Sequence, residues 1–515
     1  NTQRPEWNDA NNALVGNGVS MVTSYYLRRF LRFLTEIVEH SEAKDLMLSV
    51  ETAGFFNEMA NVWEEFGHLL KGRIDDRQRR KVLDKLGQAA SGYRSLIYKQ
   101  AFSGRKSKLS KTSLQKFLNL SLGFIDHTIK TNRRSDNLYH AYNLMTVIND
   151  DEMSISPLSE MLEGQVAVLS SGYLSSTETL QLLDGLKASR LYREDQNSYL
   201  LYPDKQLPLF LEKNNLTEET VSRSGLLQHL IRSGNRNIIE KDIRGVYHFN
   251  GNFRNVADLQ KALNELSETM PAGLVEKEVE LISGIFEEVF NHKMFTGRSG
   301  TFFAYEGLGS IYWHMVSKLQ LAVQECCLKA IRENEHPEII NRLINHYDEI
   351  NEGIGVHKPP SLYGAFPTDP YSHTPAGKGA RQPGMTGQVK EDILCRFGEL
   401  GVFTERGKLC FQPRIIREIE FLKKPAVFEY FDVFSIRRQL DLAPGTLGFT
   451  CCQVPVVYQL SEKNGLKIVF SDHPEVIQEG MSLDEKQSEM IFNRTGEIIR
   501  IDAWINRDEL MRKCT

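Results

Sequence analysis

The feature that most constrains the fold is a change in the spacing of apolar side chains along the chain. Over residues 20–50 they recur at intervals of three and four, the period of an α-helix that is buried on one face. From about residue 408 the period falls to two, which is typical of β-strands with one buried face. A chain of 515 residues is too long for one ordinary core. We therefore expect a large helical region followed by a small β-domain.

Helical spacing continues through most of the chain before residue 350. Residues 351–388 are instead rich in glycine and proline, and a long irregular segment of this kind is usually functional or disordered. Its aromatic side chains argue against disorder. The segments that we expect to be helical are 20–50, 51–100, 112–131, 158–172, 177–189, 255–292, 307–346 and, after the irregular segment, 391–401.

Strand-like alternation marks the C-terminal region, where turn residues separate the alternating stretches. We predict that these strands form an antiparallel β-sandwich. The predicted division is a helical domain over residues 1–407 and a sandwich over 408–515. The expected strands lie within residues 410–422, 426–434, 446–460, 466–472 and 497–505.

Composition excludes several classes of partner. The formal net charge is −5, so bulk charge implies neither a nucleic acid nor an anionic membrane surface. No apolar stretch is long enough to span a bilayer. The 7 cysteines form no C-x-x-C pair, which favours reduced thiols over a disulfide framework or a metal site. No signal peptide is visible, and we expect a cytoplasmic location.

An acidic residue next to a tryptophan precedes the first helical run, in the triplet Trp7-Asn8-Asp9. Asp9 has two interpretations. It is an ordinary helix N-cap, since Asp and Asn are preferred there, or it is a general acid. A general acid needs an apolar wall that keeps it protonated near neutral pH. Trp7 could supply that wall, or it could stack on a sugar ring.

The irregular segment gathers cations among glycines. Glycine lets backbone N–H groups approach an anion closely, and the string GARQPGMTGQ (379–388) runs into an expected helix start, where anions bind. Between Gly353 and Gln388 the only carboxylate is Asp369. Two interpretations stay open, an anion site and a surface loop with ordinary charges. The cationic or potentially cationic side chains are His357, Lys358, His373, Lys378 and Arg381.

A dense aromatic stretch over residues 295–318 is the third candidate. Aromatic side chains at helical spacing usually belong to the core. Those in the glycine-rich part before the helix are better candidates for a binding surface. Two further residues, His140 and Gln165, could line a pocket or could be ordinary packed residues.

These blocks together resemble, in their order, the cellobiose-phosphorylase family (glycoside hydrolase family 94) and its relatives that act on β-glucans. The resemblance covers most of the chain, but residues 205–295 have no clear counterpart. Glu6 replaces an Asp of the family, the aromatic of the fourth block is shifted, and residues 388–390 replace small residues and a Trp. The matching blocks are EWNDANN (6–12), GQVAVLSSG (164–172), LLYP (200–203), GSIYWH (309–314), YGAFPTDPY (363–371) and MTGQVKED (385–392).

The resemblance implies part of an (α/α)6 toroid, a C-terminal sandwich, and inverting phosphorolysis of a β-glucosidic oligosaccharide to a sugar 1-phosphate. Asp9 takes the place of the family's general acid. Inorganic phosphate is the co-substrate, with no other cofactor and no metal. The implied phosphate-binding residues are His373, Thr386 and Gly387, with Arg381 nearby. The implied substrate contacts are Trp7, Asn8, Tyr305, Glu306, Tyr312, Trp313, His314 and Tyr371.

The resemblance also implies partners within the protein itself. In the family the Trp-Asn-Asp motif lies midway round the toroid, so we expect the other half to come from the same gene product or from a second chain. A homodimer is expected on the same ground.

Half a toroid would expose a large apolar face, so we predict that residues 1–515 are not stable alone. Size-exclusion chromatography and thermal melting of this segment test the prediction. A compact monomer with a cooperative melting transition would contradict it.

Two other functions stay open at this stage. An inverting β-glucan hydrolase of the same fold would need a second carboxylate to activate water, and Asp369 and Glu306 are the candidates. A non-catalytic carbohydrate-binding protein on a degenerate toroid is the other, and it predicts that Asp9→Asn changes nothing measurable.

Overall fold

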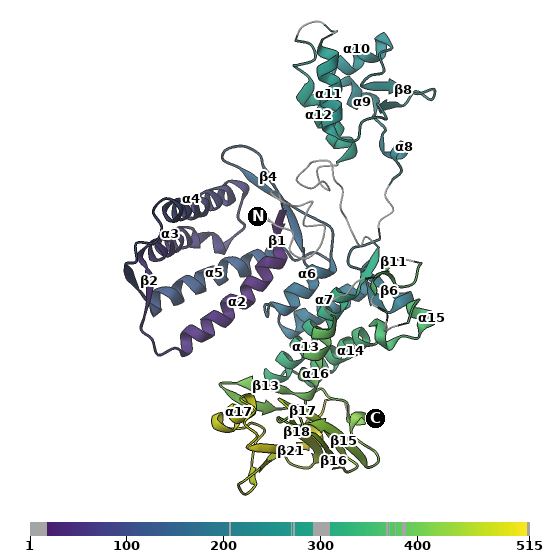
Figure 1. Ribbon diagram of the computed structural model, residues 1–515. Helices are drawn as coiled ribbons and strands as arrows, with labels where there is room; N and C mark the ends of the chain where they lie inside the picture. The colour runs from purple at the N-terminus through teal and green to yellow at the C-terminus, as the bar shows by residue number, and fades with distance from the viewer. Residues whose placement is uncertain are drawn as a thin grey trace. The chain divides into compact units, whose positions relative to one another are not determined.

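The computed structural model describes residues 18–204, 208–268, 270, 273–291, 309–366, 369, 371–375, 377–383 and 388–511. These residues divide into two units, and Figure 1 draws their elements. The first unit contains the described residues up to Ser171 and those from Leu200 to Ile311. The second contains Gly172–Tyr199 and the described residues from Tyr312 onward.

Long helices dominate the first part of the first unit (Figure 1). Each begins after a residue whose side chain accepts a hydrogen bond from the first turn, as good helix starts do. Leu31 and Val38 of one helix pack against Leu118 and Leu122 of another. The helices expected at 51–100 and 112–131 are confirmed. These helices are α2 (Met21–His40), α3 (Val50–Phe66), α4 (Asp76–Gln100) and α5 (Lys111–Thr131).

The helix expected over 20–50 is only partly correct. It ends at His40, and β2 (Asp45–Ser49) then pairs antiparallel with β3 (Lys106–Ser110). A second antiparallel sheet joins β1 (Gly18–Ser20), β4 (Tyr142–Val147) and β5 (Met153–Pro157). The helix expected at 158–172 is α6 (Leu162–Ser170), which is buried from Leu162 to Leu169.

Residues 208–291 carry a core of their own, formed by side chains from Leu216 to Phe286. The segment expected to be helical at 255–292 contains two helices, and the described residues between Ser267 and Val279 are not helical. The helices of this segment are α8 (Phe210–Lys213), α9 (Glu218–Ser222), α10 (Gly225–Ser233), α11 (Val256–Ser267) and α12 (Val279–Phe290), and its strands are β8 (Ile239–Lys241) and β9 (Tyr247–Phe249).

Because this core draws only on its own segment, we predict that residues 208–291 fold as an isolated fragment. Leu263 is 0% exposed within the core, so Leu263→Ala should lower the free energy of unfolding by about 2–5 kcal/mol. Ile243 is fully exposed, so Ile243→Ala should change it by less than about 0.5 kcal/mol. Urea unfolding followed by circular dichroism gives both values. A fragment without a cooperative transition would contradict the prediction.

The helices of the second unit are α7 (Ser176–Ala188), α13 (Trp313–Arg332), α14 (Pro337–Glu352), the single turn α15 (Pro360–Tyr363) and α16 (Gln388–Leu400). α7 confirms the helix expected at 177–189, and Ser175 and Glu178 form a capping box at its start. The helix expected at 307–346 is two, with a break after Arg332, and Ser310–Tyr312 is a short strand, β10, before α13 begins.

α13 and α16 approach closely because one position on α16 is glycine. A Cβ atom at Gly398 would lie 2.0 Å from Oε1 of Gln324. Gln324 is buried and donates hydrogen bonds to the Cys395 carbonyl (2.7 Å) and the Tyr347 hydroxyl (3.2 Å). This close approach sets where the start of α16 lies beside α13.

Strands form the C-terminal part of the second unit (Figure 1). A five-stranded sheet has the order β17-β18-β21-β19-β20, and β18 and β21 are parallel, so the sheet is not wholly antiparallel as expected. A parallel pair needs a crossover connection, which β19, β20 and α17 provide. Residues 412–422, expected within a strand, contain none. The strands of the sheet are β17 (Thr446–Cys451), β18 (Val454–Ser461), β19 (Gly465–Phe470), β20 (Val476–Gln478) and β21 (Ile498–Asn506), with α17 at Glu485–Phe492.

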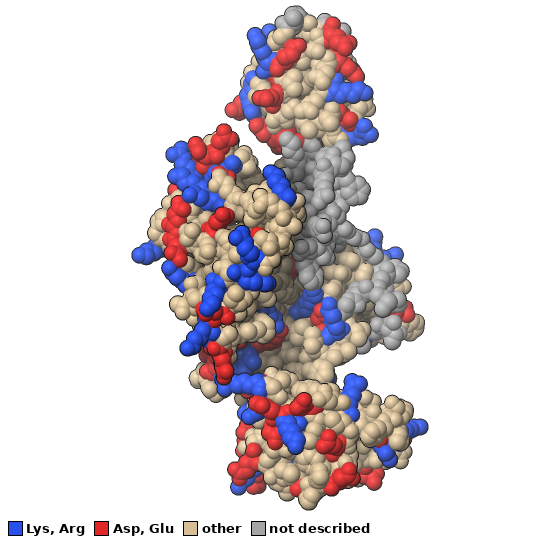
Figure 2. All heavy atoms as spheres, turned by 60° about the vertical axis from the view of Figure 1, so that its left-hand side comes forward, with Lys and Arg blue, Asp and Glu red and all other residues tan. Residues whose placement is uncertain are grey.

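Two hairpins accompany this sheet, β13 (Val402–Glu405) with β14 (Lys408–Phe411), and β15 (Ala426–Phe431) with β16 (Arg437–Leu442). Whether the region is a sandwich, and whether the helices form part of a toroid, stay predictions. Among the described residues, no helix combines the length and apolarity that crossing a bilayer requires. Charges of both signs intermingle on the face drawn in Figure 2.

Candidate functional site

Two residues predicted to bind phosphate face each other on a short hairpin of the second unit. β11 (Tyr371–Pro375) and β12 (Arg381–Pro383) are antiparallel, and His373 is the cross-strand partner of Arg381. Side chains in such a pair have Cβ atoms about 4.5–5.5 Å apart. Arg381 is exposed and His373 is 9% exposed. The hairpin therefore places Arg381 and His373 opposite each other on neighbouring strands.

His373 is held by two neighbours. The Ser372 hydroxyl lies 2.8 Å from Nδ1 of His373, and the ring of Tyr312 stacks on the imidazole, with ring centroids 4.8 Å apart and planes 13° apart. When Ser372 donates to Nδ1, the imidazole proton is on Nε2, and Nε2–H is a donor of the kind that phosphate oxygens accept. Sequence reasoning missed Ser372, although its place beside His373 on an expected loop was visible.

A second histidine, His314, lies beside the Tyr312 hydroxyl. His314, in the first turn of α13, has Nδ1 3.5 Å from the Tyr312 hydroxyl. Its Nε2 lies 3.6 Å from Oε1 of Glu391, in the first turn of α16. Burial lowers the pKa of His314, as do the charges of Lys318 and Lys390, and Glu391 opposes them. Glu391 was not predicted as a site residue.

Trp313 belongs to the core. It is 1% exposed, its indole Nε1 donates to the Thr374 hydroxyl (3.1 Å), and its ring packs against Tyr363. This burial places Trp313 away from any surface that a sugar could touch. Its hydrogen bond fixes Thr374, the neighbour of His373 on β11. The aromatic side chain is therefore a support of the hairpin.

A buried lysine, Lys358, also helps to hold Trp313 in place. Nζ of Lys358 lies 4.8 Å from the centre of the Trp313 ring and 3.4 Å from Oε1 of Gln196. Arg193 forms an ion pair with Asp195 and donates to the Thr374 carbonyl. The pKa of Lys358 is lowered to about 8, by burial first and then by the charge of Arg193, while Asp195 opposes both. No sequence motif in residues 193–196 predicts that Arg193 contacts Thr374 or that Gln196 contacts Lys358.

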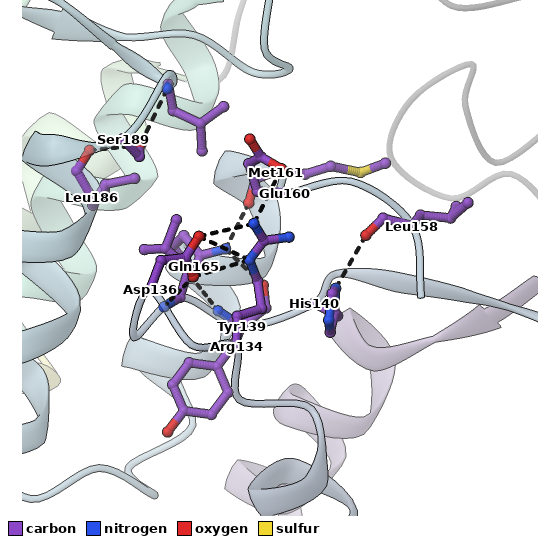
Figure 3. A network of polar contacts seen from close by, with 12 residues as sticks. Arg134, Asp136, Tyr139, His140, Leu158, Glu160, Met161, Gln165, Leu186 and Ser189 are labelled. Carbon is purple, nitrogen blue, oxygen red and sulfur yellow. Dashed lines mark hydrogen bonds and ion pairs between the residues drawn. The ribbon is translucent and has the colours of Figure 1, made fainter. Parts of the chain in front are cut away.

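Gln165 and His140, in the first unit, make structural contacts (Figure 3). The Gln165 amide accepts a hydrogen bond from the Tyr139 N–H (2.9 Å) and donates to the carbonyls of Tyr139 (2.8 Å) and Met161 (2.9 Å). Nδ1 of His140 lies 3.1 Å from the Leu158 carbonyl. These contacts favour the interpretation of both as ordinary packed residues.

An ion-pair network lies beside Gln165 (Figure 3). Arg134 pairs with Asp136 (2.8 Å) and with the buried Glu160 (3.4 Å). Its guanidinium lowers the pKa of Asp136 against the opposing effect of burial. The network holds the segment before β4 against the start of α6.

Of the remaining predicted site residues, Tyr371 is among the described residues and the others are not. Tyr371 is half-buried at the start of β11, opposite Pro383. The described residues contain no cluster of three His, Cys, Asp or Glu side chains that could hold a metal ion. The predicted residues that lie outside the described residues are Trp7, Asn8, Asp9, Tyr305, Glu306, Thr386 and Gly387.

The low pKa of Lys358 predicts a pH-dependent stability. Between about pH 8 and the ordinary lysine value of ~10.4, the unfolded chain holds this proton and the folded chain does not. The contribution of Lys358 to stability therefore rises with pH over this interval.

Lys358→Met should remove this rise, so that the stability difference between wild type and variant changes between about pH 8 and ~10.4. Urea unfolding at several pH values measures it. Lys378→Met is the control, since Lys378 is exposed between β11 and β12. Its stability should change with pH as that of the wild type does. A wild-type minus Lys358→Met difference that is constant with pH would contradict the assignment.

Comparison with known proteins gives one family match. Residues 207–293 match the family model described as GH149 phosphorylase insertion domain 2. The matched segment contains the separate core of α8 to α12, and it is the segment that lacked a counterpart in the resemblance noted from the sequence. A search of the curated proteins found no match. The match supports a glycoside phosphorylase, an enzyme that acts on carbohydrates, and it does not point specifically to the cellobiose-phosphorylase family.

Proposed function

We propose that this protein is an inverting glycoside phosphorylase that cleaves a β-glucosidic oligosaccharide with inorganic phosphate and releases a sugar 1-phosphate. The observation that carries the proposal is the match of residues 207–293 to an insertion domain of phosphorylases. The pairing of His373 with Arg381 supports it, because these two side chains offer the donors that a phosphate needs.

The charge of the hairpin favours phosphate over water as the nucleophile. Residues 371–383 contain Lys378 and Arg381 and no Asp or Glu. An inverting hydrolase needs a carboxylate about 6.5–9.5 Å from the acid to activate water. Of the two bases considered for a hydrolase, Asp369 is exposed, and Glu306 lies outside the described residues.

The proposed reaction is a single displacement. A phosphate oxygen forms a bond to the anomeric carbon while the bond from that carbon to the glycosidic oxygen breaks. The leaving oxygen takes a proton from Asp9, the residue that the family resemblance places in this role. His373 and Arg381 hold the phosphate and balance its charge, so the protein needs only one acid of its own.

Asp9→Asn should lower the rate of phosphorolysis by about 10²- to 10⁴-fold while sugar binding is retained. The assay follows the reverse reaction, which passes through the same transition state: the full-length protein is incubated with glucose 1-phosphate and β-linked gluco-oligosaccharides, and phosphate release is measured. Phosphate-free release of sugar would make the protein a hydrolase. Silence in both assays, with binding of β-glucans retained, would favour a binding protein.

His373→Asn should raise the KM for phosphate by about 10- to 100-fold, the loss expected for one hydrogen bond to a charged group. The KM for the sugar should change little. His357→Asn is the control, since His357 is exposed in the same irregular segment. An unchanged KM for phosphate in His373→Asn would remove His373 from the phosphate site.

A further inference from the structure

We propose that Glu391 is a positioning residue for phosphate binding, which acts through His314 to fix Tyr312, the ring on which His373 stacks. The proposal rests on the proposed function, since it assigns Glu391 a task in binding the co-substrate. It starts from the Glu391 carboxylate, because the requirements of folding alone do not explain why this group is buried.

Glu391 is buried without adequate partners. Its side chain is 4% exposed, and Oε2 is buried with no hydrogen-bond partner among the described residues. Oε1 lies 3.6 Å from Nε2 of His314 and 3.7 Å from Nζ of Lys390, both longer than a hydrogen bond. Burying a carboxylate in this way costs more free energy than burying a neutral Gln amide. Such a cost is typical of residues that serve a site.

His314 is the residue that the carboxylate faces, and it too is incompletely bonded. Its Nε2 is buried and has no hydrogen-bond partner among the residues that the structure describes. A carboxylate opposite Nε2 favours the tautomer with the proton on that nitrogen. Nδ1 is then an acceptor, and the hydroxyl of Tyr312, 3.5 Å away, is the donor. Through His314, Glu391 therefore acts on a contact that helps to hold the far end of the Tyr312 side chain in place.

Tyr312 carries this orientation to His373. The two rings are nearly parallel, so a change in the tilt of Tyr312 also changes the surface against which the imidazole rests. His373 faces Arg381 across the hairpin, and both must point at one phosphate to bind it.

Charges on α13 and α16 act on His314, and the neutral Tyr312 hydroxyl faces it from β10. Lys318 lies on its own helix, Lys390 and Glu391 come from α16, and Tyr312 from β10. Glu391 is the only one of these that raises the pKa of His314. Removing its charge should therefore lower that pKa further, which provides a readout independent of catalysis.

The test compares Glu391→Gln with Glu399→Gln in the full-length protein. Glu399 is on the same helix, is 16% exposed, and pairs with Arg396 and Tyr347, so it is a matched control for losing a carboxylate from α16. We expect Glu391→Gln to raise the KM for phosphate about tenfold or more, with kcat at saturating phosphate within about twofold. Glu399→Gln should leave both constants unchanged.

A double-variant cycle separates positioning from general support. In a His314→Asn background, Glu391→Gln should have little further effect on the KM for phosphate, because the route runs through His314. Equal effects in both backgrounds, or a kcat that falls as far as the KM rises, would overturn the proposal. So would an unchanged KM for phosphate in Glu391→Gln alone.

The coupling is also measured without turnover. In protein labelled with ¹⁵N-histidine, the His314 resonance is assigned by its loss in His314→Asn, and its pKa should be lower in Glu391→Gln than in the wild type. An unchanged pKa would overturn the proposal. Absence of phosphorolysis and of phosphate binding in calorimetry of the wild type would instead sink the proposed function, whatever the pKa of His314 does.

Discussion

A hydrogen bond from the Trp313 indole to the Thr374 hydroxyl joins the start of α13 to β11, and the arrangement of the candidate site depends on it. The two residues on either side of Trp313 are Tyr312 and His314, and the residue before Thr374 is His373. Fixing Trp313 and Thr374 also fixes the residues next to them in the sequence. Tyr312 therefore stacks on His373, and His314 reaches the Tyr312 hydroxyl. Lys358 lies over the Trp313 ring and Arg193 donates to the Thr374 carbonyl, so each of the two bonded residues has a further support.

This arrangement shows why a support residue and a ligand-binding residue look alike in a sequence. Tyr312, Trp313 and His314 were equally good candidates for a sugar contact, because an aromatic next to a histidine serves either role. At the strand-to-helix junction the three side chains part: Trp313 is buried against Thr374, Tyr312 stacks on His373, and His314 lies beside Glu391 of α16. That junction was expected to be helix throughout, and the error hid the division of roles.

Other parts were predictable because local chemistry decides them. Ser175 with Glu178 marks the start of α7, and Asp75 with Gln78 marks that of α4. The pairing of His373 with Arg381 was not, since it requires a hairpin within a glycine-rich segment that was expected to be irregular. Glu391 could not be found from the sequence either, because a single acid in the first turn of a helix is an ordinary preference. The parallel pairing of β18 with β21 could not be predicted either, because it joins strands that are distant in the sequence and no local pattern specifies it.

The central position of β21 in the C-terminal sheet has a consequence for how this region forms during synthesis. β21 bonds to β18 on one side and to β19 on the other, and it follows all four of its companion strands along the chain. Until the ribosome has released it, the β17–β18 and β19–β20 hairpins lack the strand that joins them. The nascent sheet therefore stays in two halves with open edges, a state in which strands pair readily with other chains.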